Sequence, residues 1–192
     1  MTKIYQVRLT NHLAVCLTAC LLILLSVSSN QAKAATPISD QMAQKFYGQC
    51  LENSKKDGTM SEQSAQVYCE CTGKTMQQNM SVEDIQAMSG QDQAARNAIN
   101  KVVTDVNGPC MAIPLHDKVY NKCMTDVGKL GMCECLASGI SLELSKQTQS
   151  MMRTLLANNP NMYDPMGELM EMPEYKQTER KIAMSCAMQQ SF

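Results

Sequence analysis

Cys69-Glu70-Cys71 and Cys133-Glu134-Cys135 are the two short stretches that decide the fold of this chain. Each lies in a segment whose pattern predicts a helix, where consecutive residues turn by about 100°. The two sulfurs of a helical Cys-x-Cys therefore diverge by about 200°, so they cannot readily bond to each other. We expect one sulfur to reach the preceding helix and the other to reach the following one.

The number of cysteines predicts a disulfide framework. The chain has 10 Cys, and eight remain once an expected signal peptide containing Cys16 and Cys20 is removed. An even count in an exported chain indicates disulfides, because compartments outside the cytosol are oxidising. Metal ligation by these cysteines is the alternative, but His116 would be the single mature histidine, too few for a Cys/His zinc pattern.

Residues 1–34 have the parts of a secretory signal peptide. Cations precede an apolar run over residues 13–27, and Ala32-Lys33-Ala34 fits a signal-peptidase site, so we expect cleavage after Ala34. The run of about 15 residues is shorter than the roughly 20 that a spanning helix needs, so we expect no stable membrane span after cleavage. An uncleaved anchor and a lipoprotein signal ending at Cys20 are the alternatives.

The order of motifs occurs twice. Tyr47-Gly48-Gln49-Cys50 precedes the first Cys-x-Cys, and Tyr120-Asn121-Lys122-Cys123 precedes the second. One distant cysteine closes each series, Cys110 in the first and Cys186 in the second. We therefore interpret residues 35–112 and 113–192 as two related helical units of one compact domain.

Distances along the chain from the expected turns predict which cysteines pair. Gly58 and Gly128 mark the turn of each helical hairpin, and the first Cys of each Cys-x-Cys lies nearer to its turn than the second does. The first is therefore better placed to bridge the hairpin, and the second is left for the distant cysteine. The predicted disulfides are Cys50–Cys69, Cys71–Cys110, Cys123–Cys133 and Cys135–Cys186.

The local pattern predicts an all-α fold, a disulfide-stapled helical bundle. Thr59 with Glu62, and Ser81 with Asp84, fit the spacing of capping boxes. Asn107-Gly108-Pro109 is expected to stop a helix. The expected helices cover residues 39–56, 59–79, 81–89, 91–106, 114–127, 132–146, 149–157 and 173–190.

Charge and composition narrow the classes of partner. The chain has 17 Lys and Arg against 18 Asp and Glu; three cations and no acid leave with the signal peptide, so the mature charge is 14 minus 18, or −4. A mildly acidic chain without a basic patch is not expected to bind nucleic acid or an anionic membrane. The absence of Trp also removes the best base-stacking side chain.

Methionine is the second unusual residue, with 17 in the chain. Met162, Met166 and Met170 recur at steps of four, within a Met-rich segment over residues 162–188. Thioethers are soft ligands that suit Cu(I), so these three are the candidate copper ligands. Met is also a flexible filler of cores that lack aromatic side chains, and the favoured interpretation is that these residues fill the core. No other cofactor is expected.

Catalytic patterns are absent from the sequence. A redox-active Cys-x-Cys needs a thiolate favoured by a nearby cation, whereas Glu70 and Glu134 lie between the sulfurs and disfavour it. No Gly-rich phosphate loop, nucleophile elbow or zinc-protease motif occurs. Redox activity therefore ranks behind a structural role for the cysteines.

The Tyr-x-x-Cys element, Tyr68-Cys69-Glu70-Cys71 and Ser81-Val-Glu-Asp-Ile-Gln-Ala-Met88 resemble small exported bacterial helical proteins with Cys-x-Cys centres, mostly uncharacterised. The resemblance covers residues 43–110 well and 119–186 more loosely. It implies an exported helical fold and brings no activity. We expect a periplasmic or secreted, non-enzymatic protein that acts through contact with an unknown protein partner, with copper binding and thiol redox chemistry as alternatives.

Overall fold

The computed structural model describes residues 34–162 and 165–189, and these contain helices and no strand. The expected signal peptide, residues 1–34, lies outside the described residues except for Ala34. The all-α, disulfide-stapled fold is confirmed. The α-helices are α2 (Asp40–Asp57), α3 (Glu62–Asn79), α4 (Val82–Ala87), α5 (Gln93–Lys101), α6 (Ala112–Asp126), α7 (Leu130–Asn158), α8 (Pro165–Glu171) and α9 (Pro173–Gln189).

Side-chain caps explain where the first helices begin. The Ser39 hydroxyl accepts the Met42 N–H at the start of α2, and Gly58, with φ +63°, ends that helix. At α4 the predicted capping box is confirmed: Ser81 Oγ accepts the Asp84 N–H, and the Asp84 carboxylate accepts the Ser81 N–H. The cap predicted for α3 is wrong by two residues, because Ser61, not Thr59, accepts the N–H three residues on.

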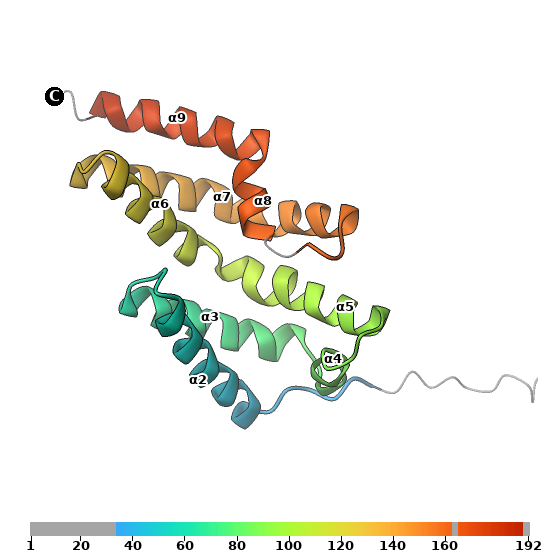
Figure 1. The fold of residues 1–192 in the computed structure, drawn as a ribbon. Coiled ribbons are helices and arrows are strands. Elements are labelled where there is room, and N and C mark those ends of the chain that lie inside the picture. The colour runs from blue at the N-terminus through green and yellow to red at the C-terminus, as the bar shows by residue number, and fades with distance from the viewer. Residues whose placement is uncertain (1–33, 163–164, 190–192) are drawn as a thin grey trace, which may run out of the picture. The chain divides into compact units, whose positions relative to one another are not determined.

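The helix expected to stop at Asn107-Gly108-Pro109 does end at Asn107, but no loop follows it. After α5 the chain continues as a π-helix, η1 (Val102–Asn107), then a 3-10 turn, η2 (Gly108–Cys110), before α6 begins at Ala112. A 3-10 turn tolerates Pro109 near its start, because that position needs no backbone N–H. Figure 1 shows α5 leading into α6 through this joint, across the middle of the described helices.

Helix α7 replaces the two helices expected over residues 132–146 and 149–157. Leu144, Thr148, Met152 and Leu156 are buried at steps of four, which gives one continuous inward stripe. The Thr148 hydroxyl donates to the Leu144 carbonyl at 2.7 Å, so this polar residue is accommodated inside the stripe. Helix α8, with Pro165 at its first position, was likewise not expected.

Two hydrophobic clusters hold the helices together. The smaller lies in the first half of residues 35–192, the unit over residues 35–112, and contains Ile38, Ala43, Met76, Met80 and Val106. The larger lies in the second half and contains Leu115, Val119, Ala137, Ile140, Leu144, Met152, Leu169 and Tyr175. The second half therefore has the more extensive aliphatic core.

The two halves meet where η1 and η2 pack on α7. Gly108 is buried there, and a Cβ at this position would lie 3.4 Å from the Gln149 side chain. The Arg153 guanidinium donates to the Asp105 carboxylate at 2.8 Å across the same contact. None of the described helices is long and apolar enough to cross a membrane.

Candidate functional site

Four disulfides join the described cysteines, in the pairs that the spacing predicts. Their Cα–Cα distances of 5.3–5.9 Å are ordinary for disulfides. The bridges are Cys50–Cys69, Cys71–Cys110, Cys123–Cys133 and Cys135–Cys186.

The sulfurs of each Cys-x-Cys reach different neighbours, as the helical geometry requires. Cys69 on α3 bonds back to α2, and Cys71 bonds forward to η2. In the second half, Cys133 on α7 bonds back to α6 and Cys135 bonds forward to α9. Each Cys-Glu-Cys is therefore the centre of its own three-segment unit.

Burial of the sulfurs favours a structural role for these bonds. Cys69 and Cys133 are 0% exposed, and Cys110 and Cys186 are 1% exposed. Every bridge therefore has at least one buried cysteine, and Cys123–Cys133 has two. Glu70 and Glu134, which lie between the two cysteines of each motif, are exposed.

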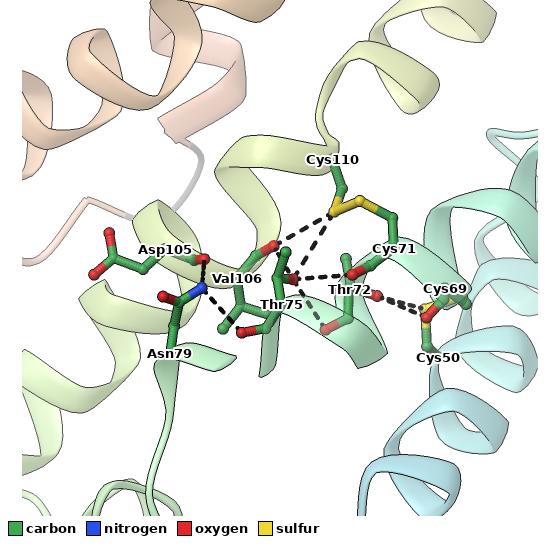
Figure 2. Close-up of a disulfide and its surroundings, with 9 residues drawn as sticks. All are labelled: Cys50, Cys69, Cys71, Thr72, Thr75, Asn79, Asp105, Val106 and Cys110. Atoms are coloured by element: carbon green, nitrogen blue, oxygen red, sulfur yellow. Dashed lines mark hydrogen bonds between the residues drawn. A yellow bond between two sulfur atoms is a disulfide. The ribbon is translucent and has the colours of Figure 1, made fainter. Parts of the chain in front are cut away.

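Figure 2 shows how α3 binds the π-helix next to the Cys71–Cys110 bridge. A helix end leaves its last carbonyl groups without intrahelical partners. Thr75 Oγ1 donates to the Val106 carbonyl at 2.8 Å, and Asn79 Nδ2 donates to the Asp105 carbonyl at 3.0 Å. The disulfide and these two hydrogen bonds together fix η1 against α3.

The candidate copper ligands lie in two different surroundings. Met166 and Met170 are on α8 and pack, half-buried, against the larger hydrophobic cluster. Met162 lies before α8, where it lines a shallow pocket with Ile99 and Leu156. The structure therefore gives at least two of the three thioethers a packing role, the interpretation that the sequence favoured.

His116 has a more structured environment than the sequence indicated. Its Nδ1 lies 3.3 Å from Asp117 and its Nε2 lies 3.4 Å from Glu134 on α7, while the ring stacks on Tyr120. Asp117 also accepts the Ser61 N–H at 2.8 Å, which ties α6 to the start of α3. Both ring nitrogens lie near carboxylates, so the His116 ring links α6 to α7.

Electrostatics at this cluster follow from its hydrogen bonds. Partial burial raises the pKa of Asp117, but hydrogen bonds from Ser61, Ser64 and His116 outweigh burial and hold the pKa below its usual value. Among the described residues, no group of three or more His, Cys, Asp or Glu side chains is placed to hold a metal ion. The cluster is best explained as a link between three helices.

Tyr175 is a further residue that sequence reasoning missed. It is 1% exposed in the larger hydrophobic cluster, and its hydroxyl has no hydrogen-bond partner among the described residues. Burial, with a contribution from the Glu179 charge, raises the pKa of Tyr175 to about 12. Its sequence neighbours on α9 are mostly polar, so the local pattern gave no signal of this burial.

No protein-family model, curated protein or solved structure matches this chain. The four disulfides indicate that it folds in an oxidising environment. Its molecular role is therefore inferred from the surfaces and cavities of its own helices.

Proposed function

We propose that this protein is exported, to the periplasm or beyond the cell, and acts without catalysis by binding another protein. The disulfides support export, because such bonds persist in oxidising compartments. The observation that carries the binding role is a group of exposed apolar side chains at one end of the bundle. We call it the apolar end and define it as Val127, Leu130, Met184 and Met188.

These side chains are large and strongly exposed, with 52–67% of each residue accessible. Val127 and Leu130 flank the turn between α6 and α7, and Met184 and Met188 lie one helical turn apart on α9. Exposed apolar groups that gather on one surface are typical of sites where a protein binds a partner.

The disulfides place the backbone segments that carry the apolar end at the same end of the helices. Cys186 lies between Met184 and Met188 in the sequence, and it is bonded to Cys135 near the start of α7. Cys133, two residues earlier, is bonded to Cys123 beside the turn. In Figure 1 the α6–α7 turn and the C-terminal end of α9 lie on the same side. A surface held by two covalent bridges loses little entropy on binding.

Site-specific photocrosslinking in the native cells tests the proposal. A photoreactive amino acid at Met188 should capture a discrete partner, whereas the same group at Gln177, exposed on α9 outside the apolar end, should not. Changing Met184 and Leu130 to Ser should weaken capture from position 188 at least tenfold. Equal capture from both positions, or none, would contradict the binding role. N-terminal sequencing of the extracellular or periplasmic protein should begin at Ala35 if it is exported as proposed.

Copper binding by the Met-rich segment has less support. Met166 and Met170 pack on the core, which leaves Met184 and Met188 as the accessible thioether pair on α9. Cu(I) titration of the oxidised protein and of a Met162→Leu, Met166→Leu, Met170→Leu variant decides this alternative. Equal, weak binding by both proteins would remove these three residues as ligands.

A further inference from the structure

Two methionines of the apolar end differ from every other described methionine in their exposure. All of the 17 methionines except Met1 lie among the described residues. Met184 is 67% exposed and Met188 is 63% exposed, whereas each of the other described methionines is buried or half-buried. An oxidant dissolved in water therefore reaches these two thioether sulfurs more easily than the rest.

Other readily oxidised side chains do not compete with these thioethers. Cysteine thiolates react readily with peroxides, but each cysteine that the structure describes is already bonded to another in a disulfide. The chain also contains no Trp. The exposed thioethers are therefore the most readily oxidised groups on the described surface.

The fold holds both sulfurs at one place on that surface. Met184 and Met188 are four residues apart on α9, so their side chains are neighbours on one face of the helix. Cys186, between them in the sequence, is 1% exposed and bonded to Cys135 on α7. The bridge ties this turn of α9 to α7 without help from the two thioethers. Oxidation of the sulfurs can therefore change the surface and leave the fold intact.

We propose that Met184 and Met188 form an oxidative modification site that reacts with hydrogen peroxide, and that their conversion to sulfoxides prevents a partner from binding at the apolar end. The second part rests on the proposed function, whereas the first part does not. In the reaction, the sulfur lone pair attacks one peroxide oxygen, so that an S–O bond forms as the O–O bond breaks. The other oxygen leaves as hydroxide and takes the proton of the first to become water. The sulfur loses two electrons and the peroxide gains them.

The effect on binding follows from the polarity of the product. A sulfoxide oxygen accepts hydrogen bonds from water, and a partner that covers it must remove that water. Two of the four side chains of the apolar end become polar, while Val127 and Leu130 are unchanged. Methionine sulfoxide reductases restore the thioether, so the modification is reversible.

Peroxide treatment of the purified, disulfide-bonded protein tests the site without a partner. Peptide mapping over time should show sulfoxide at Met184 and Met188 forming at least about tenfold faster than at the buried Met76, Met80 and Met152, because reactivity follows exposure. In the chain unfolded by denaturant, the five rates should become similar. Equal rates in the folded protein, or loss of the helical circular dichroism signal as the two sulfoxides form, would overturn the site.

Photocrosslinking from position 127 tests the effect on binding, because it leaves both thioethers in place. Peroxide given to the cells before irradiation should lower capture by the protein with both methionines at least about tenfold. A Met184→Leu, Met188→Leu variant keeps apolar groups of similar volume that cannot form sulfoxides, so it should capture equally with and without peroxide. A Met42→Leu, Met88→Leu variant is the matched control. Both of its positions pack on the smaller hydrophobic cluster, so its capture should stay sensitive to peroxide.

The two readouts separate this inference from the proposed function. If peroxide lowers capture by the Met184→Leu, Met188→Leu variant as much as it lowers capture without these changes, the effect of the sulfoxides on binding is overturned and the proposed function stands. If untreated cells give no capture from position 127, the proposed function is contradicted and the effect on binding falls with it. The rates of sulfoxide formation then still decide the modification site by themselves.

Discussion

The two halves of residues 35–192 use the same pattern of disulfides with different contact chemistry. In each, the second cysteine of Cys-x-Cys bonds a third helical segment, and the residue four positions later touches that segment or, in the first half, the π-helix that leads into it. In the first half this residue is Thr75, which hydrogen-bonds the Val106 carbonyl of η1. In the second half it is Gly139, where a Cβ would lie only 2.6 Å from Ile182 Cγ2 on α9.

This difference shows how η1 is held against α3 and how α9 is held against α7. The π-helix η1 presents carbonyl groups, so polar side chains of α3 bind it next to a small cluster of apolar residues. Helix α9 instead approaches α7 closely over a glycine and adds Tyr175 to a larger aliphatic cluster. We therefore expect the first half to depend more on its disulfide and the second half more on its packing.

Removing the disulfide that closes the longer loop in each half should have the largest effect on the free energy of unfolding. The Cys71–Cys110 and Cys135–Cys186 bridges close 39 and 51 residues, so the chain-entropy model assigns each about 4 kcal/mol. Double Cys→Ala variants of the two bridges should therefore lose similar free energies of unfolding, measured by denaturant titration.

Local stability should distinguish the same two variants. Hydrogen exchange should accelerate throughout α3 and η1 when Cys71 and Cys110 are replaced. Without the disulfide, only the smaller hydrophobic cluster and the two hydrogen bonds hold these segments together. Exchange in α7 should change less when Cys135 and Cys186 are replaced. A larger acceleration of exchange in α7 than in α3, each in its own variant, would contradict the expected difference between the two halves.

Removing the Thr75 hydroxyl should have the next largest effect on the free energy of unfolding. Thr75→Val keeps the shape of the side chain but leaves the Val106 carbonyl without this donor, at a cost of about 1–2 kcal/mol in unfolding free energy. Thr125→Val is the control, since the exposed Thr125 hydroxyl bonds only the Asn121 carbonyl of its own helix. A control loss as large as that of Thr75→Val would show that the interhelical bond contributes nothing.

Gly139→Ala should destabilise the protein, although Ala is the better helix former. The new Cβ displaces the branched Ile182 side chain, and we expect a net loss of about 1 kcal/mol in thermal or chemical unfolding. In an Ile182→Ala background the same change should become stabilising by up to about 1 kcal/mol. Gly48→Ala, on α2 with nothing within 4 Å of its Cβ, should stabilise the protein in either background.

Removing the ion pair between Asp105 and Arg153 should have the smallest effect on the free energy of unfolding. This effect should depend on pH. Partial burial raises the pKa of Asp105, but hydrogen bonds from Arg153 and Thr104 outweigh it and lower the pKa below its ordinary value. A lowered carboxyl pKa stabilises the fold above the unfolded pKa, and this contribution is lost as pH falls through the folded pKa.

Asp105→Asn should therefore reduce the unfolding free energy by about 0.5 kcal/mol at neutral pH, and the difference from wild type should vanish in acid. Asp126→Asn removes an exposed pair with Lys122 inside α6 and should change stability little at any pH. A difference in stability between wild type and Asp105→Asn that grows on acidification would contradict the expectation that this stabilisation is lost in acid.

The α4 capping box was predictable because one short stretch specifies it. Ser81 and Asp84 satisfy each other's backbone N–H groups, so no distant contact is needed to place that cap. At α3, two hydroxyl residues, Thr59 and Ser61, competed for the cap. The Ser61 N–H is bound by Asp117 from α6, a contact that the local pattern could not include.

Residues whose burial depends on contacts between helices were harder to predict than the helices themselves. Tyr175 has a polar sequence environment, yet α9 lies against α7 and buries it. Met166 and Met170 recur at a spacing that fits a soft-metal site, yet their helix packs on the core. In both cases the role of the side chain depends on which face of a short helix is covered by another helix.

The sequence by itself determined the helical class, the capping box of α4 and all four cysteine pairs. The cysteine pairs follow from 100° per residue and from distance to a glycine turn. The tertiary structure decided what happens at Gly108-Pro109, where packing on α7 keeps a potential stop within a helical path. It also decided the burial of the Tyr175 side chain in the larger hydrophobic cluster. Both outcomes depend on residues more than 30 positions away, whose contacts exist only after the helices have packed.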